Sequence, residues 1–138
     1  MSRPAAGYEL LEHTADVGVR ARGPTLEAAF EQATIGLAEV LGAWRPGDGE
    51  PVAVTVGAAD PAGVLVDWLG EVLWLHESRD AGIAGVRVDR AGEAGAGGQV
   101  TLAGHGPFDG TQVKAATYHQ LRVVPDGRGW LAEVYLDV

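Results

Sequence analysis

Hydrophobic and polar residues alternate with a period of two in several short stretches of the chain, which is typical of β-strands that bury one face. In DVGVRARG, residues 16–23, the alternation places Val17, Val19 and Ala21 on one face, and a Gly-Pro pair ends the extended run. Further strands are predicted at YELLEH (8–13), PVAVTV (51–56), GVRVD (85–89), QVTLAG (99–104), VKAATYHQLRVV (113–124) and WLAEVYLDV (130–138).

Two segments change to a period of three and four, which indicates amphipathic helices. The first begins after Thr25 and ends near Gly42, and the second begins at Asp60-Pro61, an N-cap followed by a proline at the first helical position. Their predicted buried stripes are Leu26, Phe30, Ala33, Leu37 and Val40 in the first helix, and Leu65, Trp68, Leu69, Val72 and Leu75 in the second.

The connections between strands predict the fold class. The glycine-rich AGEAGAGG, residues 91–98, holds neither a dinucleotide-binding nor a Walker motif, so we interpret it as a flexible hairpin loop. Asp126-Gly127 between two alternating runs is a strong hairpin signal. We therefore expect one α+β domain over residues 1–138: a two-layer sandwich with a mostly antiparallel or mixed β-sheet and two helices packed on one face.

Composition narrows the functional classes. The 138 residues are 46% hydrophobic and 21% charged, which is a globular balance, and 10 basic against 19 acidic residues give a net charge of −9. A chain this acidic lacks the basic surface that binding to a phosphate backbone needs, so autonomous binding to RNA or DNA is not expected. A cationic protein partner or a bound cation suits the charge better.

Two further features concern the compartment. There is no cysteine, so nothing in the chain depends on disulfides or an oxidising environment. The N-terminal residues lack the apolar region of a signal peptide, and the most apolar stretch, Val64–Leu75, is interrupted by Asp67 and Glu71. We expect a cytoplasmic protein with no membrane association.

Few residues are candidates for catalysis. The chain has neither a GxSxG nor an HExxH motif, and its serines are only Ser2 and Ser78. His76, Glu77 and Asp80 cluster at the predicted end of the second helix, where a solvated helix terminus is a more common explanation than a metal site.

Lys114 is the only lysine among ten basic residues, which suggests a need for a compact ammonium group, although chance explains one lysine in ten almost as well. Strand parity predicts that Lys114, Ala116, Tyr118, Gln120 and Arg122 share one face, and that Val113, Ala115, Thr117, His119 and Leu121 share the other. For His119, a buried ring hydrogen-bonded to the backbone is favoured over a catalytic role.

Four stretches resemble the archease family and span nearly the whole chain in the same order. They are EHTADVGVRARGPTLEAAFEQAT (12–34), LVDWLGEVLWLHE (65–77), VKAATYHQLRV (113–123) and YLDV (135–138). The resemblance implies an accessory protein, not an enzyme, that activates the tRNA-splicing RNA ligase joining 2′,3′-cyclic phosphate or 3′-phosphate ends to 5′-hydroxyl ends. It would promote guanylylation of the ligase and its multiple turnover, and would reach RNA only through that ligase.

The resemblance also implies a divalent-metal site, usually described with Ca²⁺, formed by Asp16, Asp137 and Val138. Such a cation takes about six to eight oxygen ligands, so water or nearby carbonyls would complete the set. Because Asp16 and Asp137 are far apart in the chain, the first and last strands must meet. Glu12 and His13 are candidates to orient Asp16. Candidate partner contacts are Lys114, Tyr118 and His119.

Two alternatives to a ligase activator remain open from the residues alone. A metal-dependent phosphoesterase would need a nucleophile and more metal ligands than the chain obviously offers. A general chaperone-like module in RNA processing would stimulate unrelated clients and would not depend on Asp137.

Overall fold

The computed structural model describes residues 5–12, 16–57 and 59–138 and contains two helices and seven strands. Along the chain these are β1 (Gly7–Glu12), β2 (Asp16–Gly23), α1 (Leu26–Val40), β3 (Glu50–Val56), α2 (Pro61–Arg79), β4 (Gly82–Gly92), β5 (Gly95–Ala103), β6 (Ala115–Asp126) and β7 (Gly129–Asp137).

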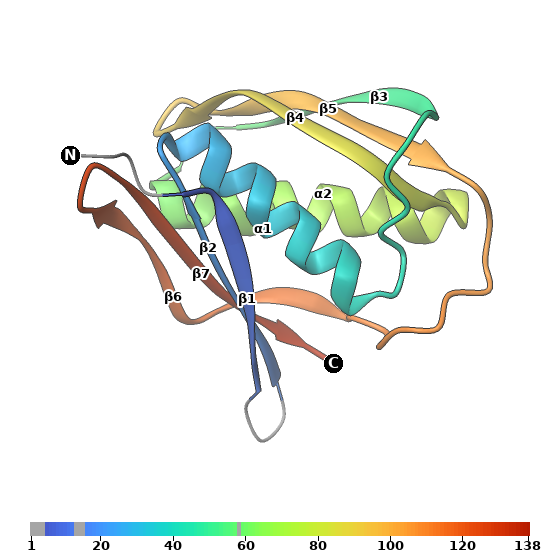
Figure 1. Ribbon diagram of the computed structural model, residues 1–138. Coiled ribbons are helices and arrows are strands. Elements are labelled where there is room, and N and C mark those ends of the chain that lie inside the picture. Colours follow the sequence, from blue (N-terminus) through green and yellow to red (C-terminus); the bar gives the residue numbers. More distant parts are fainter. Residues whose placement is uncertain (1–4, 13–15, 58) are drawn as a thin grey trace.

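The strands form two antiparallel sheets, and both helices lie between them (Figure 1). The four-stranded sheet has the order β1-β2-β7-β6 and the three-stranded sheet the order β3-β5-β4. The predicted α+β class, the antiparallel pairing and the two helices are therefore confirmed. The difference from the prediction is that the strands divide into two sheets, so the helices are covered on both sides.

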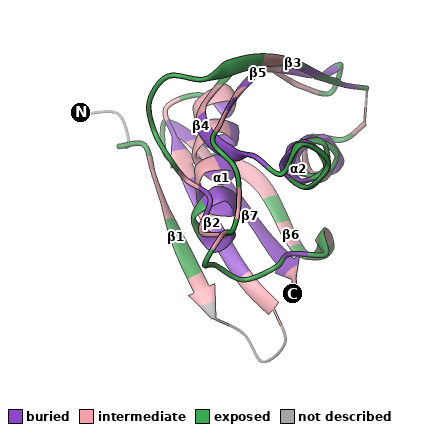
Figure 2. Cartoon of the chain, turned by 90° about the vertical axis from the view of Figure 1, so that its right-hand side faces the viewer, coloured by how far each residue is buried: buried purple, intermediate pink, exposed green. Residues whose placement is uncertain are grey.

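Helix α1 has buried residues on more than one side, which allows a second sheet to pack against it. Besides the predicted stripe, small residues on its other sides, Ala29, Gly36 and Ala38, are also buried. A Cβ atom at Gly36 would lie 2.5 Å from Cγ1 of Val19 in β2, so that helix and strand approach closely. The buried residues of α1 therefore extend beyond one stripe, while its polar residues, Glu27, Glu31, Gln32 and Glu39, remain at least partly exposed. A helix with such a wide buried surface can contact both sheets. Figure 2 shows this burial of α1 between the sheets.

The N-terminus of each helix is capped as predicted. Oγ1 of Thr25 accepts a hydrogen bond from the backbone N–H of Ala28 at 3.0 Å, and Oδ1 of Asp60 accepts one from Gly63 at 3.0 Å. These side chains satisfy N–H groups that have no partner inside the helix. The predicted buried stripes of both helices are confirmed, and Trp68 in α2 is completely buried.

The glycine-rich segment forms a hairpin, as predicted, but most of it lies within the two strands instead of a flexible loop. β4 runs to Gly92 and β5 starts at Gly95, which leaves two connecting residues. Glycine is needed there because Gly95 has a φ of +110° and because a Cβ atom at Gly98 would collide with the carbonyl oxygen of Arg87. The glycines serve close strand approach rather than mobility.

An irregularity in β6 overturns the predicted parity of that strand. Thr117 pairs with Tyr135 and Arg122 with Glu133, so five positions in β6 span two in β7, and Gln120 has a φ of +52°. This bulge inserts an odd number of residues and therefore exchanges the two faces beyond it. Ala116 and Leu121, predicted on opposite faces, both pack against the core.

A charged pair crosses the four-stranded sheet on the face away from the helices. Nε of Arg20 donates to Oε1 of Glu133 at 2.6 Å, and the Glu133 side chain is only 8% exposed. Removing one partner of a pair that is shielded from water costs more than removing one partner of a solvated pair, because the remaining charge is left without its counter-charge.

We expect Glu133→Ala to lower the free energy of unfolding by about 1.5–3 kcal/mol, because Arg20 loses a charge-assisted hydrogen bond. Asp89→Ala is the matched control, since Asp89 pairs with Arg87 at 2.9 Å on an exposed surface, and it should cost less than about 1 kcal/mol. Urea unfolding measures both variants. Equal losses in the two would contradict a special role for Glu133.

Candidate functional site

Asp16 and Asp137 meet at one end of the four-stranded sheet. Asp16 is the first residue of β2 and Asp137 the last residue of β7, and they are direct partners in the antiparallel register. Residues directly opposite each other have Cβ atoms about 4.5–5.5 Å apart, and two like charges in this arrangement repel each other. Both residues are half-buried, so the repulsion is only partly screened by water.

The main chain around Asp137 is fixed on both sides. Its carbonyl oxygen accepts a hydrogen bond from the backbone N–H of Lys114 at 2.7 Å, and Ala115 is its register partner in β6. Val138 packs its side chain against the core. Asp137 is therefore held between β2 and β6, and Lys114 lies beside this pair of acids.

The Asp16–Asp137 pair belongs to the face of the sheet that points away from the helices. Strand alternation places Gly18 with Asp16, and Tyr135 with Asp137, on this face. A Cβ atom at Gly18 would lie 2.9 Å from the Tyr135 ring, so the ring packs where Gly18 has no side chain. Thr117 donates its hydroxyl to the carbonyl oxygen of Tyr135 at 3.1 Å.

Three residues predicted to contact a partner, Lys114, Tyr118 and His119, lie near this end of the sheet. His119 is exposed, which corrects the expectation of a buried ring, and its ring lies edge-on to Tyr135 with centroids 6.2 Å apart. Tyr118 is 66% exposed and Lys114 is also exposed. The bulge explains the correction, because it breaks the alternation between His119 and Leu121, the core residue with which parity had grouped it.

Glu12 ends β1 opposite Val17, and its backbone is described although its side chain is not. His13 lies outside the described residues. The proposed orientation of Asp16 by Glu12 and His13 therefore stays a prediction.

The oxygen ligands at this end of the sheet can fill only part of the coordination sphere of a hard cation. Two carboxylates supply up to four oxygens, and main-chain oxygens of Asp137 and Val138 lie next to them along the chain. Within the described part of the chain, no group of three or more His, Cys, Asp or Glu side chains is placed to hold a metal. A divalent cation would fit here only with several coordination positions filled by water or by a partner.

The cluster at the end of α2 has a structural explanation. His76 is buried, its Nδ1 lies 2.7 Å from the carbonyl oxygen of Ala81, and its ring lies 4.8 Å from that of Phe108. Asp80 adopts the left-handed conformation that ends the helix. His76 thus closes the helix terminus and is buried rather than solvated.

The alternating pattern of each strand does not show which residues of β2 and β7 pair with each other. The sequence offers one clue to this register: Asp16 begins one alternating run and Asp137 ends another. If the two strands pair antiparallel with their apolar faces aligned, these acids become neighbours. The fold and this site define a class: an α+β sandwich protein whose second and last strands carry a pair of facing carboxylates.

Comparisons with known proteins identify the family of this chain. Residues 8–138 match the model of the Archease protein family (MTH1598/TM1083). The chain is 33% identical to "Protein archease" of Methanosarcina barkeri over 147 residues, covering 100% of both chains. It is 36% identical to "Protein archease" of Thermococcus gammatolerans over 142 residues, covering 95% of this chain and 98% of the relative.

Two solved structures are also similar. The solution structure of protein 1598 of Methanobacterium thermoautotrophicum gives a TM-score of 0.71 at 28% identity, covering 96% of this chain and 99% of that one. The crystal structure of an archease from Thermotoga maritima, described as a possible chaperone, gives 0.67 at 26% identity, covering 100% and 98%. The chain belongs to the archease family, as its sequence motifs predicted. No helix in the described part of the chain is long and apolar enough to cross a membrane.

Proposed function

We propose that this protein is an accessory protein of the tRNA-splicing RNA ligase and that it acts through a divalent cation held by Asp16, Asp137 and Val138. The observation that carries the proposal is the direct pairing of Asp16 with Asp137 at the end of adjacent strands. Two facing carboxylates repel each other unless a cation lies between them, so the pairing favours a cation-binding role. Family membership supports the accessory role, since none of the relatives named above carries the name of an enzyme.

The chain's own residues would then have separate tasks. Asp16 and Asp137 would bind the cation with their carboxylates, and Val138 would add main-chain oxygen. The hydrogen bond from Lys114 to Asp137 holds that strand end in place. When bound, the cation would supply positive charge with open coordination positions, which suit phosphate or carboxylate oxygens of a ligase active site.

We infer that this end of the sheet enters the metal-binding cleft of the ligase and favours the conformation that reacts with the guanine nucleotide. Lys114, Tyr118 and His119 surround the same end and would contact the ligase there. RNA would be reached only through the ligase, as the net charge of −9 favours. We expect this encounter in the cytoplasm.

The test is multiple turnover of the purified ligase with and without this protein. Asp16→Ala should abolish the stimulation, while Glu93→Ala, which removes an exposed carboxylate on the β4–β5 hairpin, should leave it unchanged. Residues added after Val138 should also reduce stimulation, because they crowd the same strand end. Full stimulation of the ligase by the Asp16→Ala variant would contradict the proposal.

The description of the Thermotoga maritima protein as a possible chaperone favours one alternative, a general chaperone-like role. That role predicts that the protein assists the refolding of unrelated enzymes and that Asp137→Ala changes nothing. A phosphoesterase is tested by incubation with generic phosphoesters and Mg²⁺, Mn²⁺ or Ca²⁺. Turnover lost in Asp16→Ala would overturn the accessory role.

A further inference from the structure

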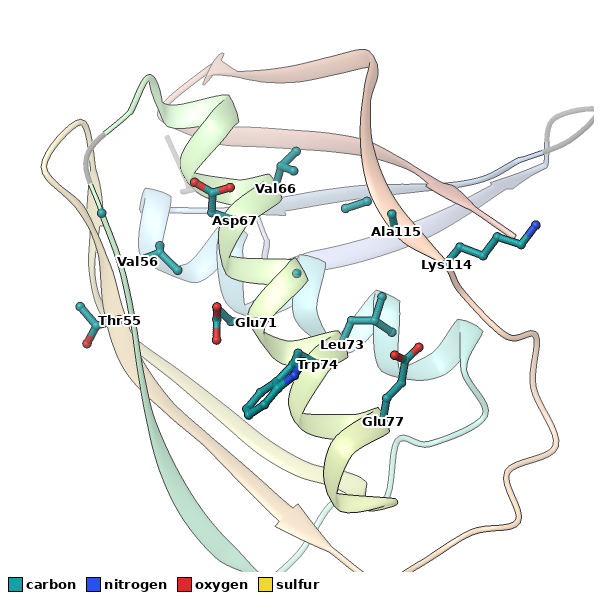
Figure 3. A pocket seen from close by; sticks show the side chains of 13 residues that line it. Thr55, Val56, Val66, Asp67, Glu71, Leu73, Trp74, Glu77, Lys114 and Ala115 are labelled. Atoms are coloured by element: carbon teal, nitrogen blue, oxygen red, sulfur yellow. The ribbon is translucent and has the colours of Figure 1, made fainter.

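A second surface, away from the face that carries Asp16 and Asp137, is hollowed along α2. A groove of about 630 Å³ is lined by the end of β3, by one side of α2 and by the start of β6 (Figure 3). Each of these strands lies at the edge of its own sheet. The groove therefore follows the open side of the sandwich, where α2 alone closes the space between the two sheets.

The α2 side of this groove is acidic and carries an exposed aromatic ring. Asp67, Glu71 and Glu77 are exposed at helical spacing, and Trp74, between them, is 59% exposed. None of the ion pairs within the described ranges includes these three carboxylates. In Figure 3 the ammonium of Lys114 extends away from them. The groove thus presents uncompensated negative charge beside an indole face, which is the chemistry that attracts arginine and lysine side chains.

Gly70 lies in the middle of α2 on the same side of the helix. It is exposed, and a Cβ atom there would meet no atom within 4 Å. The fold does not need a glycine at this position, and glycine in a helix interior is unfavourable. Its lack of a side chain leaves the helix backbone open to close approach by another chain between Asp67 and Trp74.

The edge of β3 supplies a further means of recognition. β3 pairs with β5 on one side, and its other side faces no strand among the described residues. Such an edge presents backbone N–H and C=O groups that an extended peptide can use.

We propose that this groove is a docking site for an extended, arginine- or lysine-bearing segment of a protein partner. The segment runs between α2 and the edge of β3, with its backbone close to Gly70. One cation stacks on Trp74 and others face Asp67, Glu71 and Glu77. Nucleic acid is disfavoured by the same carboxylates. The proposal does not rest on the ligase, because binding is measurable with the isolated protein.

The test uses the capped peptide (Arg-Val)4 as a probe and (Glu-Val)4 as its control, with calorimetry and ¹H–¹⁵N NMR. We expect saturable binding of the basic peptide alone, with shifts of the Trp74 indole and Gly70 amide resonances. Trp74→Ala should weaken binding about fivefold through loss of the cation–π contact, and Glu71→Lys about tenfold through charge reversal. The matched control, Glu93→Lys, makes the same charge change outside the groove and should alter binding less than about twofold.

Substitutions at Gly70 distinguish a loss of peptide binding from a loss of folding. Gly70→Ala should raise Tm, because it improves helix propensity, and Gly70→Leu should weaken peptide binding while the protein stays folded. Equal effects of Glu71→Lys and Glu93→Lys, or unshifted Trp74 and Gly70 resonances, would overturn the proposal. A dimer in light scattering that is lost in Trp74→Ala would also overturn it, because the occupant would then be a second copy of this chain.

Discussion

Calcium at about 100 times its dissociation constant is expected to raise Tm by about 10 °C and to leave the double variant Asp16→Asn, Asp137→Asn unaffected. The reason is that a ligand which binds only the folded state stabilises it, here by about 2.7 kcal/mol. The two carboxylates face each other across β2 and β7. Binding requires both strands in register, so the unfolded chain offers no such site.

Without calcium, we expect the order of thermal stability of the unmodified protein and the double variant to reverse. The double variant should then be at least as stable as the unmodified protein, since it removes two like charges in direct opposition. The control replaces two exposed acids of the β4–β5 hairpin, Asp89→Asn in β4 and Glu93→Gln in the connection, and should keep the full calcium response. Thermal unfolding with calcium and with EDTA measures all three proteins. A calcium response that survives in the double variant would exclude this site.

Replacing Trp68 is expected to have the largest effect on folding. Trp68→Ala should lower the free energy of unfolding by about 3–5 kcal/mol, because it opens a cavity in a close-packed core. The indole is completely buried, and its Nε1 donates to Oγ1 of Thr34 at 2.9 Å. Thr34 in turn donates to the carbonyl oxygen of Phe30 at 2.8 Å. The ring thus ties α2 to α1 through a buried polar contact.

Two variants separate packing from hydrogen bonding in this contact. Thr34→Val leaves the indole N–H without an acceptor and should cost about 1–3 kcal/mol. Trp74→Ala makes the same chemical change as Trp68→Ala on the exposed side of the same helix, and it should change stability by no more than about 0.5 kcal/mol. Urea unfolding measures each variant. Similar losses for Trp68→Ala and Trp74→Ala would contradict the assigned burial.

Local pattern was sufficient to predict most elements. Thr25 and Asp60 start the helices as expected, and the Asp126-Gly127 turn joins β6 to β7. These features depend on neighbours within a few residues, through side-chain capping and the backbone preferences of glycine. The β4–β5 hairpin was predicted only in part, because glycine permits close strand approach as readily as flexibility.

The site was predicted less from pattern than from family resemblance. The motifs around Asp16 and Asp137 identified the family, which the comparisons confirm. The metal role of these residues stays a proposal. The position of His119 was predicted wrongly, since a bulge of odd length exchanges the faces of a strand and leaves no period in the sequence.

The sequence by itself determined the helices, most strands, their buried stripes and the acidic charge, because each follows from local periodicity and composition. Only the tertiary structure decided that the strands form two sheets around α1 and α2, and that Asp16 directly faces Asp137. Strand order and register depend on contacts between residues far apart in the chain. The alternation in each strand specifies which face is buried, and packing alone selects the neighbour.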